Sequence, residues 1–272
     1  MSGLGNRKRA LTDVVTVDAW HDIFNGKIKQ AALHAHVHFG QARIGDEPNL
    51  KISFRLGIRQ AEVILVVPET EGLMVDKSSV ARRPTKAKFE AVISNRTTKS
   101  KAWISKVGGV LGLKPKASAS AARTGTLKTE SERRAKTTLS APMLVSQSQT
   151  AEGHYRWQIV SAADDCLVGQ PWDAEKEPRL TLVDQNAGKD RSIEPAVRIE
   201  VRCLREDLLI SDIKVTDASF MDRIKGSYGH RNNEIAAECF IRDELIRNGL
   251  GVGDIHNRFA SITIAAVIAE SV

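Results

Sequence analysis

Hydrophobic and polar residues alternate along several short stretches of the chain, a pattern typical of strands that bury one face. In "LHAHVHF" (33–39), apolar residues fall on one face of the expected strand and three histidines on the other. The alternation returns in "LKISFRLGI" (50–58), which we expect to form a hairpin with the first stretch and to continue into a strand at 62–67. Further strands are expected at 142–149, 155–162, 179–184 and 208–215, and turn-forming sequences between them favour antiparallel sheets.

Two of the alternating segments resemble each other. "EPNLKISFR" (47–55) aligns without gaps with "EPAVRIEVR" (194–202), and "RQAEVI" (59–64) resembles "REDLLI" (205–210) after one skipped residue. Convergence explains a match this short, because any exposed strand favours this pattern, and a diverged internal repeat is the alternative interpretation.

The C-terminal part of the chain changes character. "RNNEIAAECFIRDELIRNGLG" (231–251) predicts a helix that begins near Asn232 or Asn233 and ends before Gly249. Glu234 and Glu238 share a face of this helix, and we expect both to be solvated. The final "NRFASITIAAVIAESV" (257–272) fits either a helix or a strand.

These elements predict a mainly β protein of the β-rich α+β type, with two antiparallel sheet units and C-terminal helical packing. We place the first β unit at 1–95, a basic flexible insertion at 96–140 and the second β unit, with its helix or helices, at 141–272. The insertion is expected to be disordered because residues 114–138 contain a single large apolar side chain, Leu127, and no aromatic one.

Charge is distributed very unevenly along the chain. The net charge of +7 combines a segment from Lys77 to Lys136, with 16 Lys/Arg and three Glu (+13), and a remainder with 24 Lys/Arg and 30 Asp/Glu (−6). Such asymmetry indicates a polyanionic or acidic partner. We therefore expect a non-catalytic nucleic-acid-binding or structural and assembly protein that makes sequence-nonspecific phosphate contacts. The expected contact residues are Lys99, Lys101, Lys106, Lys114, Lys116, Arg123, Lys128, Arg133, Arg134 and Lys136.

A membrane surface is an alternative partner for the same segment. Trp103, Ile104 and Val107 fall at helical spacing and are flanked by lysines, as in helices that lie on anionic membranes. A peripheral, matrix-like structural protein is the corresponding alternative function. An acidic protein partner and a homo-oligomer are further expected partners, and a solvated loop without a ligand is the plain alternative.

The three histidines His34, His36 and His38 are a candidate metal site, because imidazoles at i and i+2 on a strand converge on one side. A polar strand face without a ligand is the simpler interpretation. A third interpretation combines the histidines with Lys51, Arg55 and Arg59 of the expected neighbouring strand in an anion-binding face.

A second candidate site is catalytic. Asp184 closes one expected strand and Glu200 and Arg202 lie in a later one, which resembles the layout of PD-(D/E)xK nucleases. Those enzymes bind Mg²⁺ with two carboxylates and orient water with a lysine. Arginine at 202 departs from that pattern, since it replaces the lysine poorly.

Other sequence features concern the cellular setting. Cys166, Cys203 and Cys239 are scattered and odd in number, which argues against a disulfide framework. No secretory signal and no apolar run of about 20 residues is visible, so we expect a cytoplasmic protein without a transmembrane segment. We expect no cofactor.

Overall fold

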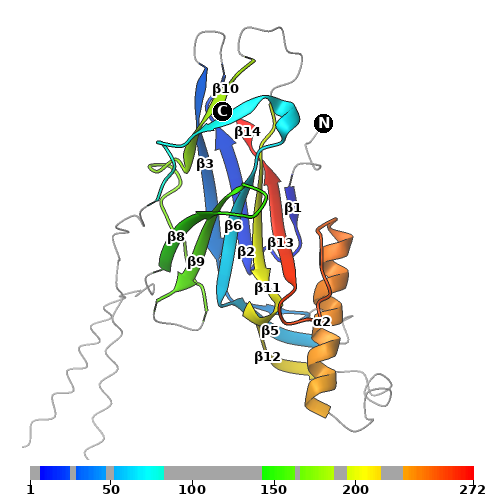
Figure 1. The fold of residues 1–272 in the computed structure, drawn as a ribbon. Helices are drawn as coiled ribbons and strands as arrows, with labels where there is room; N and C mark the ends of the chain where they lie inside the picture. Colours follow the sequence, from blue (N-terminus) through cyan, green and yellow to red (C-terminus); the bar gives the residue numbers. More distant parts are fainter. Residues whose placement is uncertain are drawn as a thin grey trace, which may run out of the picture. The chain divides into compact units, whose positions relative to one another are not determined.

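The computed structural model describes residues 7–24, 29–46, 52–82, 143–162, 166–186, 195–215 and 229–272, in which strands dominate and one α-helix is present (Figure 1). The strands and helices have the following bounds: β1 (Arg7–Arg9), β2 (Val15–His21), β3 (Gln30–Phe39), β4 (Ala42–Ile44), β5 (Ile52–Ile58), β6 (Gln60–Val66), the 3₁₀ turn η1 (Glu69–Glu71), β7 (Leu73–Asp76), β8 (Met143–Gln149), β9 (Tyr155–Ser161), β10 (Leu180–Asp184), β11 (Arg198–Leu204), the 3₁₀ turn η2 (Arg205–Asp207), β12 (Leu208–Val215), α2 (Gly229–Arg247), β13 (Ser261–Ile268) and β14 (Glu270–Ser271). The prediction of a mainly β fold is confirmed.

The described strands form three sheets. A six-stranded sheet has the order β1-β13-β11-β6-β9-β8, a five-stranded sheet the order β14-β2-β3-β10-β7, and a three-stranded sheet the order β12-β5-β4. Neighbouring strands are antiparallel except β14 and β2, which are parallel. Residues 1–88 and 141–272 belong to one compact unit, and each sheet combines strands from both segments.

Alternation of side chains builds one continuous core. Buried residues of the five-stranded sheet, such as Val17 and Ala35, belong to the same apolar cluster as Val63, Val201 and Ile264 of the six-stranded sheet. Helix α2 adds Ala237, Ile241 and Leu245 to this cluster and contacts β5 and β12 (Figure 1). Burial of this apolar area is the main contribution to the stability of the fold.

The repeated segments take related places in the fold. β5 leads through Arg59 into β6, and β11 leads through η2 into β12. β5 pairs with β12, and β6 pairs with β11. The first strand of each segment therefore pairs with the second strand of the other, as a two-fold axis between two copies would require. Their outer neighbours differ, since β5 also pairs with β4 and β11 with β13, so the duplication stays a prediction.

The C-terminal part of the chain forms one helix, α2, and then a strand, β13, that joins a sheet. Helix α2 confirms the expected helix, but it begins at Gly229, so Asn232 and Asn233 lie within it and the expected start is wrong. Gly249 follows the helix with a φ of 68°, a left-handed conformation that favours glycine. The ambiguous end forms strand β13, which lies between β1 and β11. No helix in the described part of the chain is long and apolar enough to cross a membrane.

Candidate functional site

The expected phosphate contacts from Lys99 to Lys136 lie outside the described residues, and so do Trp103, Ile104 and Val107. The first residues of the basic segment are described. They follow β7, which lies at one edge of the five-stranded sheet, and the chain re-enters the described fold at β8, at one edge of the six-stranded sheet.

The start of the basic segment is held firmly against the sheets. Val80 is buried, and the N–H of Ala81 donates to the carbonyl of Arg179 at 2.8 Å. The indole Nε1–H of the buried Trp157 donates to the carbonyl of Ala81, also at 2.8 Å. The chain therefore leaves the sheets at Arg82, from a fixed position beside β9.

Arg179 is itself part of this anchor. Its guanidinium is buried, lies 4.3 Å from the centre of the Trp172 ring and donates to the carbonyl of Glu177 at 3.1 Å. Burial lowers the pKa of Arg179 to about 10, and the Glu177 carboxylate opposes this shift. The side chain remains charged at neutral pH, and its attraction to the face of Trp172 fixes the ring.

The three histidines lie on β3, as the alternation predicts, but their neighbours differ from the expected ones. β3 pairs with β2 and β10, whereas Arg55 lies on β5 in another sheet and Arg59 follows β5 directly. The expectation of a hairpin between the histidine strand and residues 50–58 is wrong. The proposed anion-binding face of histidines and strand-β5 cations therefore does not form by strand pairing, because β5 pairs with β4 and β12 instead.

Two of the histidine rings already have protein partners. His34 stacks on Trp20 and places Nδ1 2.6 Å from the carbonyl oxygen of Ala174, while Nε2 of His36 lies 2.9 Å from Nε2 of Gln170. His38 is exposed. Among the described residues, no group of three or more His, Cys, Asp or Glu side chains is placed to hold a metal ion.

The candidate nuclease residues lie on strands that do not pair. Asp184 ends β10 of the five-stranded sheet and accepts a hydrogen bond from the N–H of Asn186 at 2.9 Å. Glu200 lies on β11 of the six-stranded sheet, where its carboxylate binds Arg198 at 2.7 Å and the Nε of Arg202 at 2.8 Å. Strand pairing thus does not bring Asp184 and Glu200 together, and Arg202 serves as an ion-pair partner of Glu200.

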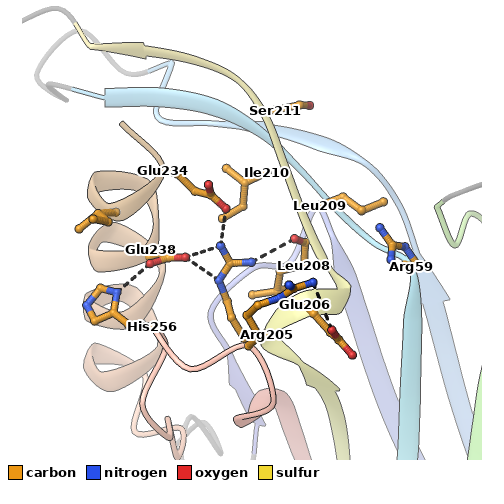
Figure 2. Close-up of a pocket in the computed structure, with 12 residues that line it drawn as sticks. Arg59, Arg205, Glu206, Leu208, Leu209, Ile210, Ser211, Glu234, Glu238 and His256 are labelled. Atoms are coloured by element: carbon orange, nitrogen blue, oxygen red, sulfur yellow. Dashed lines mark hydrogen bonds and ion pairs between the residues drawn. The ribbon is translucent and has the colours of Figure 1, made fainter. Parts of the chain in front are cut away.

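A cavity of about 710 Å³ lies between η2, β12, α2 and the loop after residue 253. Figure 2 shows Arg205 at its centre, with its guanidinium directed at acidic residues of α2. Arg205 donates from Nε to Glu238 Oε1 at 2.8 Å, from Nη2 to Glu234 Oε1 at 2.9 Å and from Nη1 to the carbonyl of Leu208 at 3.4 Å. Glu238 is only 8 % exposed, so the expectation that it is solvated is wrong, whereas Glu234 is exposed.

His256 completes this cluster. Its Nδ1 lies 2.7 Å from Glu238 Oε2, and a turn in which the N–H of His256 donates to Asp254 Oδ1 fixes its backbone (Figure 2). A carboxylate that orients an imidazole can support proton transfer at the other ring nitrogen. Nucleophilic catalysis would also require a Ser, Thr or Cys in hydrogen-bond reach of that ring, and no described contact supplies one. The cluster joins three segments of the fold: η2, α2 and the loop before β13.

The sequence contains only a weak signal for this cluster. Arg205 lies at the bend between two strands, and a polar side chain at such a bend is usually solvated. Only the packing of α2 on β12 reveals that Arg205 and Glu238 are buried together. The sequence matches no protein-family model, and it has no significant similarity to a curated protein.

Proposed function

We propose that this chain is a non-catalytic nucleic-acid-binding protein that uses its basic segment for sequence-nonspecific phosphate contacts and its β fold for structure and assembly. The observation that carries the proposal is the separation of charge, with +13 between Lys77 and Lys136 and −6 in the rest of the chain. Lysines and arginines that neutralise phosphates release condensed counterions, which drives binding without reading the bases. The acidic remainder repels the same polyanion, so the basic segment carries the attraction.

The anchoring of the segment supports this proposal. The contacts of Ala81 with Arg179 and Trp157 fix where the basic segment leaves the sheets. Because the start of the basic segment is held in place, a polyanion bound there already lies near the cations that follow. Each further contact therefore costs less entropy. The few aromatic residues in the segment, Phe89 and Trp103, favour contacts with phosphate over stacking on bases.

The test is a salt titration of binding. Fluorescence anisotropy with labelled single- and double-stranded DNA and RNA is measured with and without Mg²⁺. One variant replaces four cations of the basic segment with glutamine (Lys128, Arg133, Arg134 and Lys136), and a matched control replaces four exposed cations of the β unit (Arg43, Lys176, Lys214 and Arg247).

We expect log Kd of the wild type to depend steeply on log salt concentration. The slope should decrease by roughly 0.7 to 0.9 for each phosphate interaction that the first variant removes, and should change little in the control. The absence of binding at low salt, or equally weakened binding in both variants, would overturn the proposal.

The two alternative functions predict other outcomes, one in a vesicle-binding assay and one in the Mg²⁺ arm of the titration. A peripheral membrane protein should bind anionic phospholipid vesicles, and Trp103→Asp should abolish that binding. Cleavage of the labelled nucleic acid only in the presence of Mg²⁺ would instead point to a nuclease that uses Asp184 and Glu200.

A further inference from the structure

A second, smaller hollow lies where the basic segment leaves the fold. It has a volume of about 260 Å³ and is lined by residues from the end of β7 onward and from the edge hairpin of β8 and β9. Its lining residues are Lys77, Arg82, Gln147, Ser148, Gln149 and Tyr155. Ser148 contributes through its backbone, because its side chain lies on the other face of β8 from those of Gln147 and Gln149. The other five side chains each carry at least one hydrogen-bond donor, two of them are cationic, and none is a carboxylate.

The fold builds this hollow from two anchored pieces. In the ladder between β8 and β9, Gln147 lies opposite Trp157 and Gln149 opposite Tyr155, so that these four side chains share one face. Trp157 is buried at the core end of that face and donates to the carbonyl of Ala81. This hydrogen bond brings Arg82 next to the two glutamines and to Tyr155.

The donors that line the hollow are only partly used by the protein. The side-chain amides of Gln147 and Gln149 each donate once, to the carbonyls of Ser148 at 2.7 Å and of Gly153 at 3.5 Å, and each amide has a second hydrogen. The Arg82 guanidinium donates one hydrogen bond to the carbonyl of Lys77 at 3.1 Å and has four further N–H donors.

The acid closest in sequence does not neutralise the hollow. Asp76 Oδ1 accepts hydrogen bonds from the hydroxyl of Ser78 at 2.7 Å and from its N–H at 2.9 Å. These hydrogen bonds lower the pKa of Asp76, so the carboxylate stays ionised but is directed into its own turn. Lys77 and Arg82 are both exposed and form the positive rim.

We propose that this hollow binds a backbone phosphate of the nucleic acid at the point where the basic segment leaves the β unit. The inference rests on the proposed function, to which it adds a defined site on the described fold. A tetrahedral phosphate accepts several hydrogen bonds at once, which matches a hollow whose lining side chains all offer donors, include no carboxylate and are closed by two cations. The Tyr155 ring offers a surface for the adjoining sugar or base. A nucleic acid bound at this site lies next to the start of the basic segment.

The first measurement uses inorganic phosphate as the probe and Tyr155 as the reporter. The sequence has two tyrosines, so full-length protein labelled with 3-fluorotyrosine gives two ¹⁹F signals, and Tyr155→Phe identifies the one from the hollow. Phosphate is titrated at constant ionic strength into the wild type, into Lys77→Gln/Arg82→Gln and into a matched control, Lys214→Gln/Arg247→Gln. Circular dichroism spectra and thermal unfolding midpoints that match the wild type show that the variants keep their fold.

We expect phosphate to shift the Tyr155 signal in the wild type and in the control, and to leave it unshifted in Lys77→Gln/Arg82→Gln. A wild type without a shift, or an equal shift in both double variants, would overturn the site.

The second measurement is binding of a labelled oligonucleotide to the same three proteins. At about 0.1 M salt we expect roughly tenfold weaker binding by Lys77→Gln/Arg82→Gln, with a salt slope lower by about one to two, and little change in the control. Tight binding by the wild type that Lys77→Gln/Arg82→Gln retains in full would overturn this site and leave the proposed function standing. A wild type that does not bind the oligonucleotide would overturn the proposed function and, with it, this assignment of the ligand, even where phosphate shifts Tyr155.

Discussion

The guanidinium of Arg205 and the carboxylate of Glu238 form an ion pair in which both side chains are about nine-tenths buried. The pair connects the bend between β11 and β12 with the middle of α2, and His256 binds the second carboxylate oxygen of Glu238. Removal of one partner from a buried pair leaves an uncompensated charge in the interior.

Glu238→Ala should therefore lower the free energy of unfolding by about 3–5 kcal/mol. Glu234→Ala is the matched control, because Glu234 binds the same guanidinium but is exposed, and its removal should cost at most about 1 kcal/mol. Urea denaturation followed by circular dichroism measures both. Equal effects of the two substitutions would show that the pair with Glu238 is not the contact that holds α2.

Gly57 is required by a close approach to Cys166. A Cβ atom at position 57 would lie 2.6 Å from the Sγ of Cys166. Gly57→Ala should destabilise the fold by about 1–3 kcal/mol, as overpacking of a core does. Gly57→Ala/Cys166→Ala should recover most of that stability, since the second substitution removes the sulfur atom. A double variant as unstable as Gly57→Ala in thermal denaturation would place the conflict elsewhere.

Asp207 makes the stability depend on pH. Burial raises its pKa above the usual 3.8, and Glu206 adds to the shift while Arg59 opposes it. Because the folded state prefers the protonated acid, the ionised carboxylate costs stability at neutral pH. This cost disappears as the pH falls through the folded-state pKa towards the unfolded-state value.

Asp207→Asn should accordingly be more stable than the wild type at pH 7, and the difference should shrink as the pH approaches 4. Urea midpoints of both proteins across this pH range measure the effect. A variant that is less stable than the wild type at pH 7 would contradict the assigned direction of the shift.

Glu200 is expected to stabilise the fold and to take no part in nucleic-acid binding. Its side chain is buried between Arg198 and Arg202, so Glu200→Gln should lower the free energy of unfolding by about 1–3 kcal/mol. Nucleic-acid affinity should change little, since the basic segment is untouched. The combination of urea denaturation with the anisotropy assay separates the two effects, and a loss of Mg²⁺-dependent cleavage in this variant would speak against a purely structural role.

Local features of the fold follow from the amino-acid sequence alone. Alternating side chains located strands such as β9 and β12, because a strand with one buried face imposes a period of two. Apolar spacing and Gly249 located the body and the end of α2, because a helix commonly ends before a glycine, whereas Asn232 and Asn233 did not mark its start at Gly229. The charge asymmetry is also a property of the sequence, and the proposed function depends on it.

Strand pairing and the burial of polar groups, in contrast, emerge only in the folded chain. Alternation marks the faces of β3 but not its neighbours, which are β2 and β10 and not the next long strand in the chain. Arg205 and Glu238 lie 33 residues apart, and each has the pattern of an exposed residue. Their meeting depends on how α2 packs on β12, and the anchor of Trp157 on Ala81 depends in the same way on sheet packing. Pairing and burial are set by competition among all possible contacts of the folded chain, which a local pattern does not contain.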